Sequence, residues 1–463
     1  MRRVTATDLP AGPARPTPLL SAGYRGATVG SVSLVFLAAF ESLAVTTVMP
    51  TVSADLDGRS LYAVAFSATL ASSVLGMVLV GRAADRMGAV RPLVASVALF
   101  GVGLLLAGLA PTMETLVVGR FVQGLGAGGL SVALYVLVAQ VFAEVDRLRI
   151  LGAFAAAWVL PGLVGPFVAG VVADTLGWRW VFLGAVGLAA AALALLTSSL
   201  RHVPPPERAA DEQGAGGAAD GVRRVLLALV VAASVLGLNA AGGLDGPLRV
   251  VAGAAAVALA LAALVPLLPA GALLAARGLP SVVAQRGLVG GTFFAAEAYL
   301  PYLLQEQYDV TVWVSGLVLT AATLGWAGAS QVQGRLGERL ADVTALRLGA
   351  LLLLAGVGSL LVVVPLHLSA VWVVVGWPVA ATGMGLMYPR ITSAVLARTT
   401  VRERGSASAA VTLADAVGAA VGVALAGLVF TAVGTADDRA AFVAVLAVAT
   451  TLASLAVVVS RRT

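Results

Sequence analysis

The chain has 463 residues, of which 60% are hydrophobic and only 11% are charged, and its formal net charge is +6. Soluble domains carry about 25% charged residues, so this composition excludes a water-soluble globular protein. There is no cysteine, and the two histidines, His202 and His367, fall outside the apolar stretches, so we expect no disulfide and no metal site. We expect no cofactor either. All 29 basic residues are arginines scattered through short loops, a distribution that does not form the single basic patch of a nucleic-acid-binding protein.

Apolar runs recur along the whole chain. A helix needs about 20 apolar residues to cross a bilayer, and the sequence contains fourteen runs of this kind, separated by polar loops. The short alternating segments of an outer-membrane barrel are absent. The runs lie near 27–49, 61–80, 92–110, 116–141, 150–173, 180–199, 225–244, 248–271, 282–304, 312–333, 346–365, 369–389, 405–432 and 440–460.

The arginines predict the orientation in the membrane. Short cytoplasmic loops carry an excess of positive charge. Placing both termini in the cytoplasm puts every arginine on that side except Arg59, Arg120, Arg179, Arg249 and Arg439. Since residues 1–25 have no apolar core followed by a cleavage site, they do not resemble a signal peptide. We expect a bacterial inner (plasma) membrane protein that contacts the lipid bilayer and is monomeric.

An internal repeat divides the chain. The loop after the second run reads GRAADR from Gly81, the loop after the tenth reads GRLGER from Gly334, and Glu41 in the first run recurs as Glu297 in the ninth. Parallel repeats are how many secondary transporters build a site between two halves. We therefore predict an all-α polytopic membrane protein with two homologous six-helix bundles and an inserted helix pair. The predicted parts are a disordered cytoplasmic tail at 1–25, an N-terminal bundle at 26–200, a proline- and glycine-containing cytoplasmic linker at 201–224, the inserted pair at 225–271 and a C-terminal bundle at 280–463.

Several motifs resemble those of the major facilitator superfamily. The loop GRAADRMG at 81–88 resembles its signature between spans two and three, although Ala89 and Val90 replace part of the usual basic end. The stretch from Arg120 to Gly126 resembles its fourth-span signature. The run from Glu41 to Pro50 resembles the first-span acidic motif of the fourteen-span drug:proton antiporters, with Glu in place of the commoner Asp.

The fifth run contributes a further likeness, because its glycines and prolines resemble the motif associated with exporters. The resemblance covers nearly the whole chain and implies the major facilitator fold with fourteen transmembrane helices. It also implies that two groups of residues act in the conformational change between inward-facing and outward-facing states. These are Gly81, Asp85, Arg86 and Gly88 in the loop, and Gly162, Gly165, Pro166 and Gly170 in the fifth run.

Four charged residues, Glu41, Arg120, Glu297 and Asp415, qualify in this interpretation as charges deep inside membrane helices. A charge at the centre of a membrane helix costs about 2.5–3.5 kcal/mol on insertion scales, so each needs a reason. At about 1.5 Å per residue, Glu41 and Arg120 both lie about 21 Å from the cytoplasmic face. Each would lower the cost of burying the other if spans one and four are neighbours, as the resemblance implies.

We predict these four residues as the proton-coupling groups. Burial favours a neutral carboxyl and a nearby arginine favours the carboxylate, so movement of the arginine would change proton affinity. We predict the substrate cavity to contain Glu41, Gln123, Glu297 and Trp377.

Structural alternatives stay open for each group. Glu41 and Arg120 could form an ion pair that only fixes helix register. Asp415 could hydrogen-bond within a glycine-rich packing face, and the glycines of the fifth run could be packing contacts. Asp85 and Arg86 would themselves act structurally, by holding the cytoplasmic helix ends in one state.

The predicted function is proton-coupled export of small lipophilic or cationic compounds such as drugs. The partners are a small-molecule substrate and protons. Export of a lipid or endogenous metabolite is an alternative, as is a metabolite facilitator or importer of the same fold. An enzyme is not expected, because the spans hold no nucleophile with its base and no metal cluster. Direct use of ATP is not expected either, since the chain has no lysine and hence no phosphate-binding loop.

Overall fold

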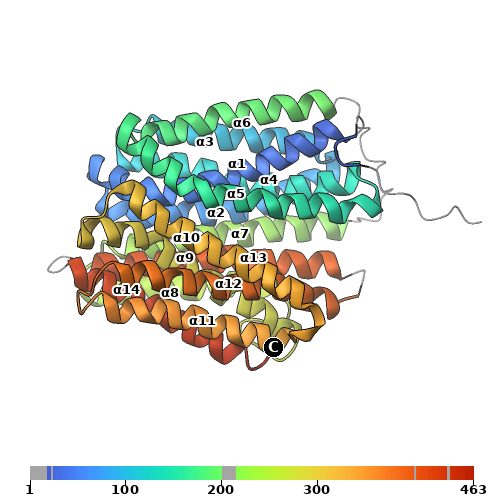
Figure 1. The fold of residues 1–463 in the computed structure, drawn as a ribbon. Coiled ribbons are helices and arrows are strands. Elements are labelled where there is room, and N and C mark those ends of the chain that lie inside the picture. The colour runs from blue at the N-terminus through green and yellow to red at the C-terminus, as the bar shows by residue number, and fades with distance from the viewer. Residues whose placement is uncertain (1–17, 22–23, 201–214, 401–402, 435–437) are drawn as a thin grey trace, which may run out of the picture.

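The computed structural model describes residues 18–21, 24–200, 215–400, 403–434 and 438–463, which form an all-helical molecule (Figure 1). The predicted tail up to residue 17 and the predicted linker from 201 to 214 lie outside the described residues. The long helices of the described part are α1 (Arg25–Asp55), α2 (Tyr62–Met87), α3 (Val90–Gly108), α4 (Met113–Val141), α5 (Glu144–Leu176), α6 (Arg179–Leu200), α7 (Ala215–Ala241), α8 (Gly246–Leu264), α9 (Leu279–Tyr308), α10 (Val312–Leu336), α11 (Asp342–Val363), α12 (Val371–Ala397), α13 (Arg404–Val433) and α14 (Asp438–Val459).

Thirteen of these helices, counted over the described residues, are long and apolar enough to cross a membrane. The exception is α9, whose apolar run is interrupted by Gln285, Arg286 and Glu297. All three side chains are buried or half-buried among other helices. A helix surrounded by protein can hold polar groups that lipid would exclude, which explains how α9 keeps its place in the bundle.

The two predicted six-helix bundles are confirmed by the way the helices pack. In the N-terminal bundle, α1 packs on α5 and α6, α2 packs on α4, and α3 packs on α4 and α6. The same contacts recur eight helices later, with α9 on α13 and α14, α10 on α12, and α11 on α12 and α14. The bundles meet along two seams, α2 with α13 and α5 with α10. This arrangement has the pseudo-twofold symmetry that the sequence repeat predicts.

Repeated glycines allow close helix packing in both bundles. A Cβ added to Gly126 of α4 would lie 2.3 Å from the backbone N of Phe100 in α3. A Cβ added to Gly383 of α12 would lie 2.4 Å from the carbonyl O of Gly349 in α11. Small residues of this kind let backbones approach in membrane proteins. Gly126 and Gly383 lie 257 positions apart at matching places in the two bundles, so the internal repeat preserves a packing contact.

The bundles are joined tightly at the end where α1 finishes and α2 begins, which we call the tyrosine end. The Tyr62 hydroxyl of α2 donates to the carbonyl of Ala298 in α9 at 2.6 Å. Its ring lies 5.2 Å from that of Tyr299 and 4.7 Å from that of Tyr302, measured between centroids. Gln305 Nε2 donates to the carbonyl of Thr47 in α1 at 3.4 Å. These contacts close the tyrosine end.

We call the opposite end, which carries residues 88–89, 142–143, 337–341 and 398–400, the arginine-rich end. Hydrogen bonds at this end lie within each bundle: Ala89 N donates to Gln140 Oε1 of α4 at 3.2 Å, and Arg398 Nη2 donates to the carbonyl of Thr463 at 3.0 Å. The hydrogen bonds that Tyr62 and Gln305 make between the two bundles both lie at the tyrosine end.

Candidate transport site

Glu41 of α1 and Arg120 of α4 form a buried ion pair through Glu41 Oε1 and Arg120 Nη1, although 79 residues separate them in the chain. They are 6% and 4% exposed. The same Nη1 donates to Gln123 Oε1 at 2.7 Å, and Arg120 Nε donates to the carbonyl of Ala65 in α2 at 3.3 Å. One arginine therefore ties together α1, α2 and its own helix.

This pair has the partners that a buried charge requires. Burying an ion pair costs several kcal/mol of desolvation per ion unless the geometry is good and further hydrogen bonds satisfy the remaining donors. Arg120 meets that requirement with a carboxylate, an amide and a carbonyl. Gln123 Nε2, however, is buried without a partner in the described structure. The network thus has one amide group, Gln123 Nε2, that is free to donate to a new acceptor.

Glu297 of α9 occupies the repeat position of Glu41, but no hydrogen bond or ion pair satisfies its carboxyl group within the described part of the chain. It is only 8% exposed. The position that corresponds to Arg120 is Trp377 of α12, which is fully buried and whose Nε1 has no partner among the described residues. The C-terminal bundle therefore holds a carboxyl group where its partner arginine is replaced by an aromatic ring.

Aromatic side chains fill the surroundings of that carboxyl. Phe293 lies one turn before Glu297 on α9 and stacks on Trp377, with a centroid distance of 4.7 Å and an interplanar angle of 22°. Phe293 also makes an edge contact with Trp326 of α10 at 5.5 Å, and Trp326 makes one with Tyr388 of α12 at 4.9 Å. Aromatic faces carry partial negative charge and attract organic cations.

Asp415 of α13 belongs to a third group of charged and polar side chains. The sequence analysis named Asp415 but did not predict its partners. Its Oδ2 lies 3.1 Å from Arg286 Nη2 of α9, and its Oδ1 accepts from the Tyr388 hydroxyl at 2.8 Å. The Arg286 guanidinium carbon stands 3.3 Å from the centroid of the Tyr388 ring. Both carboxylate oxygens of Asp415 are therefore occupied. The sequence held one sign of this role for Arg286, because a charged residue stands there a few positions inside the ninth apolar run.

The loop motif of the N-terminal bundle differs from its repeat. Asp85 and Arg86 end α2 at the arginine-rich end, where both are exposed and make no ion pair with a described residue. Gly81 is half-buried, and Gly88 has a φ of 80°, which a residue with a side chain would rarely adopt. In the C-terminal bundle, Arg390 of α12 fixes the matching helix end.

That C-terminal contact is extensive. Arg390 Nη2 donates to the carbonyls of Gln333 and Gly337 at 3.1 and 2.7 Å, and its Nη1 lies 3.0 Å from Asp342 Oδ1. An arginine that satisfies the last carbonyls of a helix stabilises its C-terminus. Arg390 thus holds the loop at 334–341 in place, whereas Asp85 and Arg86 of the loop at 81–88 remain free to form ion pairs in another conformation.

The glycines of α5 line its seam with α10. A Cβ on Gly170 would lie 2.5 Å from Cα of Trp313, and one on Gly162 would lie 2.3 Å from Cγ2 of Thr323. From the other side, a Cβ on Gly316 would lie 2.5 Å from the carbonyl of Pro166. Gly165 packs more loosely against Phe40 of α1. The motif residues therefore permit close contact between the bundles, and the sequence analysis left that role open.

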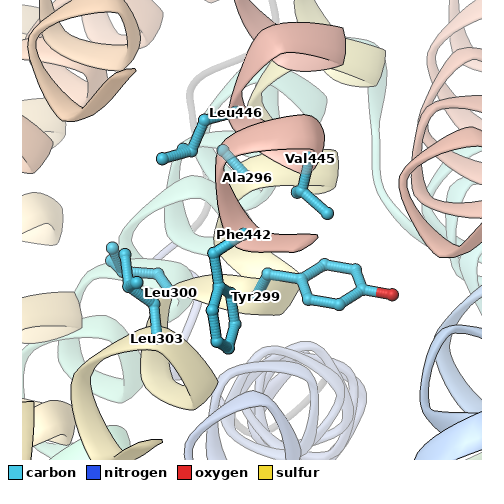
Figure 2. A pocket seen from close by; sticks show the side chains of 7 residues that line it. All are labelled: Ala296, Tyr299, Leu300, Leu303, Phe442, Val445 and Leu446. Carbon is cyan, nitrogen blue, oxygen red and sulfur yellow. The ribbon is translucent and has the colours of Figure 1, made fainter. Parts of the chain in front are cut away.

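A small apolar pocket beside Tyr299 does not compete for the role of transport site. Figure 2 shows it lined by Ala296, Tyr299, Leu300 and Leu303 of α9 and by Phe442, Val445 and Leu446 of α14. Its volume is about 10 Å³, which is at most one water molecule. It is a packing defect within the C-terminal bundle. No cluster of metal-ligating side chains occurs among the residues that the structure describes.

Comparison with known proteins places the chain in a family. The model of the Major Facilitator Superfamily matches residues 32–423 and 292–463. The MFS efflux transporter aclA of Aspergillus oryzae is 36% identical over 164 residues, 35% of this chain and 30% of its own length. An uncharacterized MFS-type transporter of Mycobacterium tuberculosis is 33% identical over 201 residues, 41% of this chain and 29% of its own length. These matches span about a third of the length of the curated relatives.

Solved structures agree on the fold. A peptide transporter POT in complex with sulfate is 17% identical with a TM-score of 0.65, and the match covers 94% of this chain and 92% of that one. A bacterial homolog of the human lysosomal transporter Spinster, in an inward-facing and occupied conformation, is 12% identical with a TM-score of 0.66, covering 96% of this chain and 98% of that one. Thirteen of the described helices are long and apolar enough to cross a membrane, the two bundles repeat one architecture, and the family model covers most of the sequence: the chain belongs to the Major Facilitator Superfamily and is a multi-pass membrane protein.

Proposed function

We propose that this transporter is a proton-coupled exporter of small lipophilic or cationic compounds that works by alternating access. The observation that carries the proposal is the pair of repeat-related acidic groups, Glu41 bound to Arg120 and Glu297 without a partner. Glu41 can exchange its counter-ion, Arg120, for a proton. Glu297 lies beside aromatic rings and offers negative charge to a cation.

The proton step follows from the ion pair. Protonation of Glu41 removes the charge that balances Arg120, and a buried arginine without its counter-ion is strongly destabilised. Arg120 must then find other acceptors, and Gln123 Oε1 and the carbonyl of Ala65 already contact it. The resulting loss of the α1–α4 link would favour a rearrangement of α1 relative to α4. Reformation of the pair would release the proton on the other side.

Glu297 supplies the substrate side of the mechanism. An unpaired buried carboxylate is costly, and a bound organic cation would remove that cost by pairing with it. Phe293, Trp326 and Trp377 would surround the apolar body of such a cation. Asp415 enters the scheme as a second candidate proton group, provided its contact with Arg286 opens during transport.

Orientation and direction are parts of the same proposal. We place the arginine-rich end in the cytoplasm and the chain in a bacterial inner membrane as a monomer. The relative aclA is described as an efflux transporter, which supports export. Another relative, 31% identical over 166 residues, is described as an Acurin A biosynthesis cluster MFS-type transporter of Aspergillus aculeatus. That description favours the alternative in which the exported compound is an endogenous metabolite.

Reconstitution tests the proposal directly. The purified protein would be placed in liposomes with an imposed pH gradient and a pH-sensitive dye inside, and tetraphenylphosphonium would be added as a lipophilic cation. Dissipation of the gradient that requires both protein and cation is expected. Glu41→Gln should abolish it, whereas Glu114→Gln, a change at an exposed acid of α4, should not. Dissipation by Glu41→Gln at the wild-type rate would refute the assignment of Glu41.

A further inference from the structure

The inserted helices α7 and α8 lie against only one of the two seams between the bundles. In Figure 1, α7 runs between the N-terminal bundle and α13. It packs on both α2 and α13, the two helices that form this seam, and α8 packs on α7. The pseudo-twofold axis relates this seam to the α5–α10 seam, where α5 and α10 contact each other directly through glycines. The insertion therefore breaks the symmetry of the molecule at one place.

Apolar side chains of three helices meet under α7. Toward the arginine-rich end, one cluster contains Val74 and Leu75 of α2, Ala228 and Val231 of α7, and Val417 of α13. A second cluster, nearer the tyrosine end, contains Ala71 of α2, Ala232, Val235 and Leu238 of α7, and Ala420 and Ala424 of α13. Side chains of α7 thus take part in filling the seam along most of the membrane.

Exposure of the two seams differs accordingly. On α2, the large apolar side chains exposed are Leu79, at 43%, and Met87 at the helix end, at 48%. On α5, by contrast, Trp158 is 51% exposed and Leu160 is 54% exposed, with further valines and leucines exposed along the same helix. The inserted pair covers the α2–α13 seam from lipid and leaves the α5–α10 seam uncovered.

Polar contacts attach the inserted pair to each bundle at the tyrosine end. Asn239, near the end of α7, donates from Nδ2 to Ser67 Oγ of α2 at 2.8 Å. Arg249, near the start of α8, donates from Nη1 to the carbonyl of Ala432 of α13 at 3.4 Å. Its Nε donates to the carbonyl of Leu244 in the loop between the two helices at 2.6 Å. The connection between α7 and α8 thus bridges the N-terminal and C-terminal bundles.

Alternating access requires the bundles to part at the tyrosine end. Because the inserted pair is bound to α2 on one side and to α13 on the other, that motion must break at least one of these attachments. Hydrogen bonds between helices contribute to association in membranes, where apolar packing against lipid gives no hydrophobic drive. We propose that α7 and α8 form a clamp across the α2–α13 seam that stabilises the conformation closed at the tyrosine end, with Asn239 as its principal polar contact.

The absence of cysteine from the sequence makes the test practical. Pairs of introduced cysteines carry spin labels, and distances are measured by double electron–electron resonance on the full chain in lipid nanodiscs. Leu109 and Leu366, exposed at the tyrosine end of the two bundles, report on that end. Gly152 of α5 and Ser393 of α12, exposed toward the arginine-rich end, report on the other. Neither protons nor substrate enter this measurement, so its outcome is independent of the proposed coupling.

Asn239→Ala should raise the ratio of tyrosine-end-open to tyrosine-end-closed molecules about threefold, the factor given by an average interhelical hydrogen bond in a membrane protein. Ser67→Ala removes the same bond from the opposite side and should give the same shift, and the double variant should add little to either. Ser234→Ala is the matched control, because Ser234 of α7 bonds only to the carbonyl of Val230 in its own helix at 2.7 Å. Unchanged distance distributions in both Asn239→Ala and Ser67→Ala, or an equal shift in Ser234→Ala, would overturn the clamp.

Discussion

The two bundles share one architecture and differ in how they treat their central acid. In the N-terminal bundle, Glu41 is paired with Arg120, which is itself satisfied by Gln123 and Ala65. In the C-terminal bundle, Glu297 lacks such a partner in the described structure because Trp377 stands where the arginine would be. The packing glycines have been kept in both bundles while the chemistry has diverged. A duplicated scaffold thus leaves each half free to take a different role.

A similar contrast holds for the helix ends. The C-terminal bundle fastens its 334–341 loop with Arg390, whereas the Asp85 and Arg86 charges of the N-terminal bundle stay exposed. In the C-terminal bundle, moreover, an ion pair joins the first and fifth helices of the repeat through Arg286 and Asp415, and in the N-terminal bundle one joins the first and fourth. The first helix of the repeat carries the acid of the N-terminal pair and the base of the C-terminal pair. The two charge centres therefore respond to different helix movements.

The largest effect is expected when one partner of the Glu41–Arg120 ion pair is removed and the other is kept. Arg120→Leu leaves Glu41 buried without a counter-ion, which should cost about 3–5 kcal/mol of stability. Thermal unfolding in detergent would show this as a lower transition temperature. Adding Glu41→Gln to Arg120→Leu should recover much of the loss. If the double variant were as unstable as Arg120→Leu alone, the instability would not come from an unpaired carboxylate.

The unpaired centre should behave in the opposite way. Glu297→Gln removes a carboxyl that has no partner, so it should leave thermal stability unchanged or raise it, because an unsatisfied buried charge is unfavourable. The same change should weaken transport of tetraphenylphosphonium by about tenfold, the loss that corresponds to about 1.4 kcal/mol of cation binding. Uptake into reconstituted vesicles measures this. A large loss of stability with Glu297→Gln would show that Glu297 has a structural partner.

Rebuilding the missing pair sharpens the comparison further. Trp377→Arg places an arginine at the repeat position of Arg120, but it also removes the stack on Phe293. The single variant should be destabilised, and combining it with Glu297→Gln should destabilise it by about a further 1.5–3 kcal/mol, because hydrogen bonds to charged groups are worth that much. A double-mutant cycle of unfolding temperatures isolates the coupling. Strict additivity would show that the two positions do not meet.

Much of this architecture could be predicted from the chain alone. Apolar run lengths predicted the fourteen helices, and the repeats of Gly81, Gly334, Glu41 and Glu297 predicted two bundles. Counting residues from the ends of the runs placed Glu41 and Arg120 at one level, and the structure joins them. The depth of a residue in the membrane can be estimated from the sequence because a helix rises by a fixed distance per residue.

Lateral contacts were harder to predict, because they depend on which faces of the helices meet. The Arg286–Asp415 pair links residues 129 positions apart, and the contact of Tyr388 with both has no periodic signal. The packing of α7 and α8 on the α2–α13 seam was equally hidden, since a run of apolar residues does not say whether lipid or another helix covers it. Such features required the folded arrangement.

The smallest predicted effect tests how Tyr388 stabilises the Arg286–Asp415 ion pair, through its hydroxyl or through its ring. Tyr388→Phe keeps the ring beneath Arg286 but removes the hydroxyl that donates to Asp415 Oδ1. Because Arg286 still holds Oδ2, the loss of stability should be about 1 kcal/mol, close to that of one ordinary hydrogen bond. Tyr388→Leu also removes the ring and should lower the unfolding temperature further. Equal effects of the two substitutions would assign the contribution of Tyr388 to its hydroxyl alone, and then the close approach of the guanidinium to the ring would add nothing to the cohesion of α9, α12 and α13.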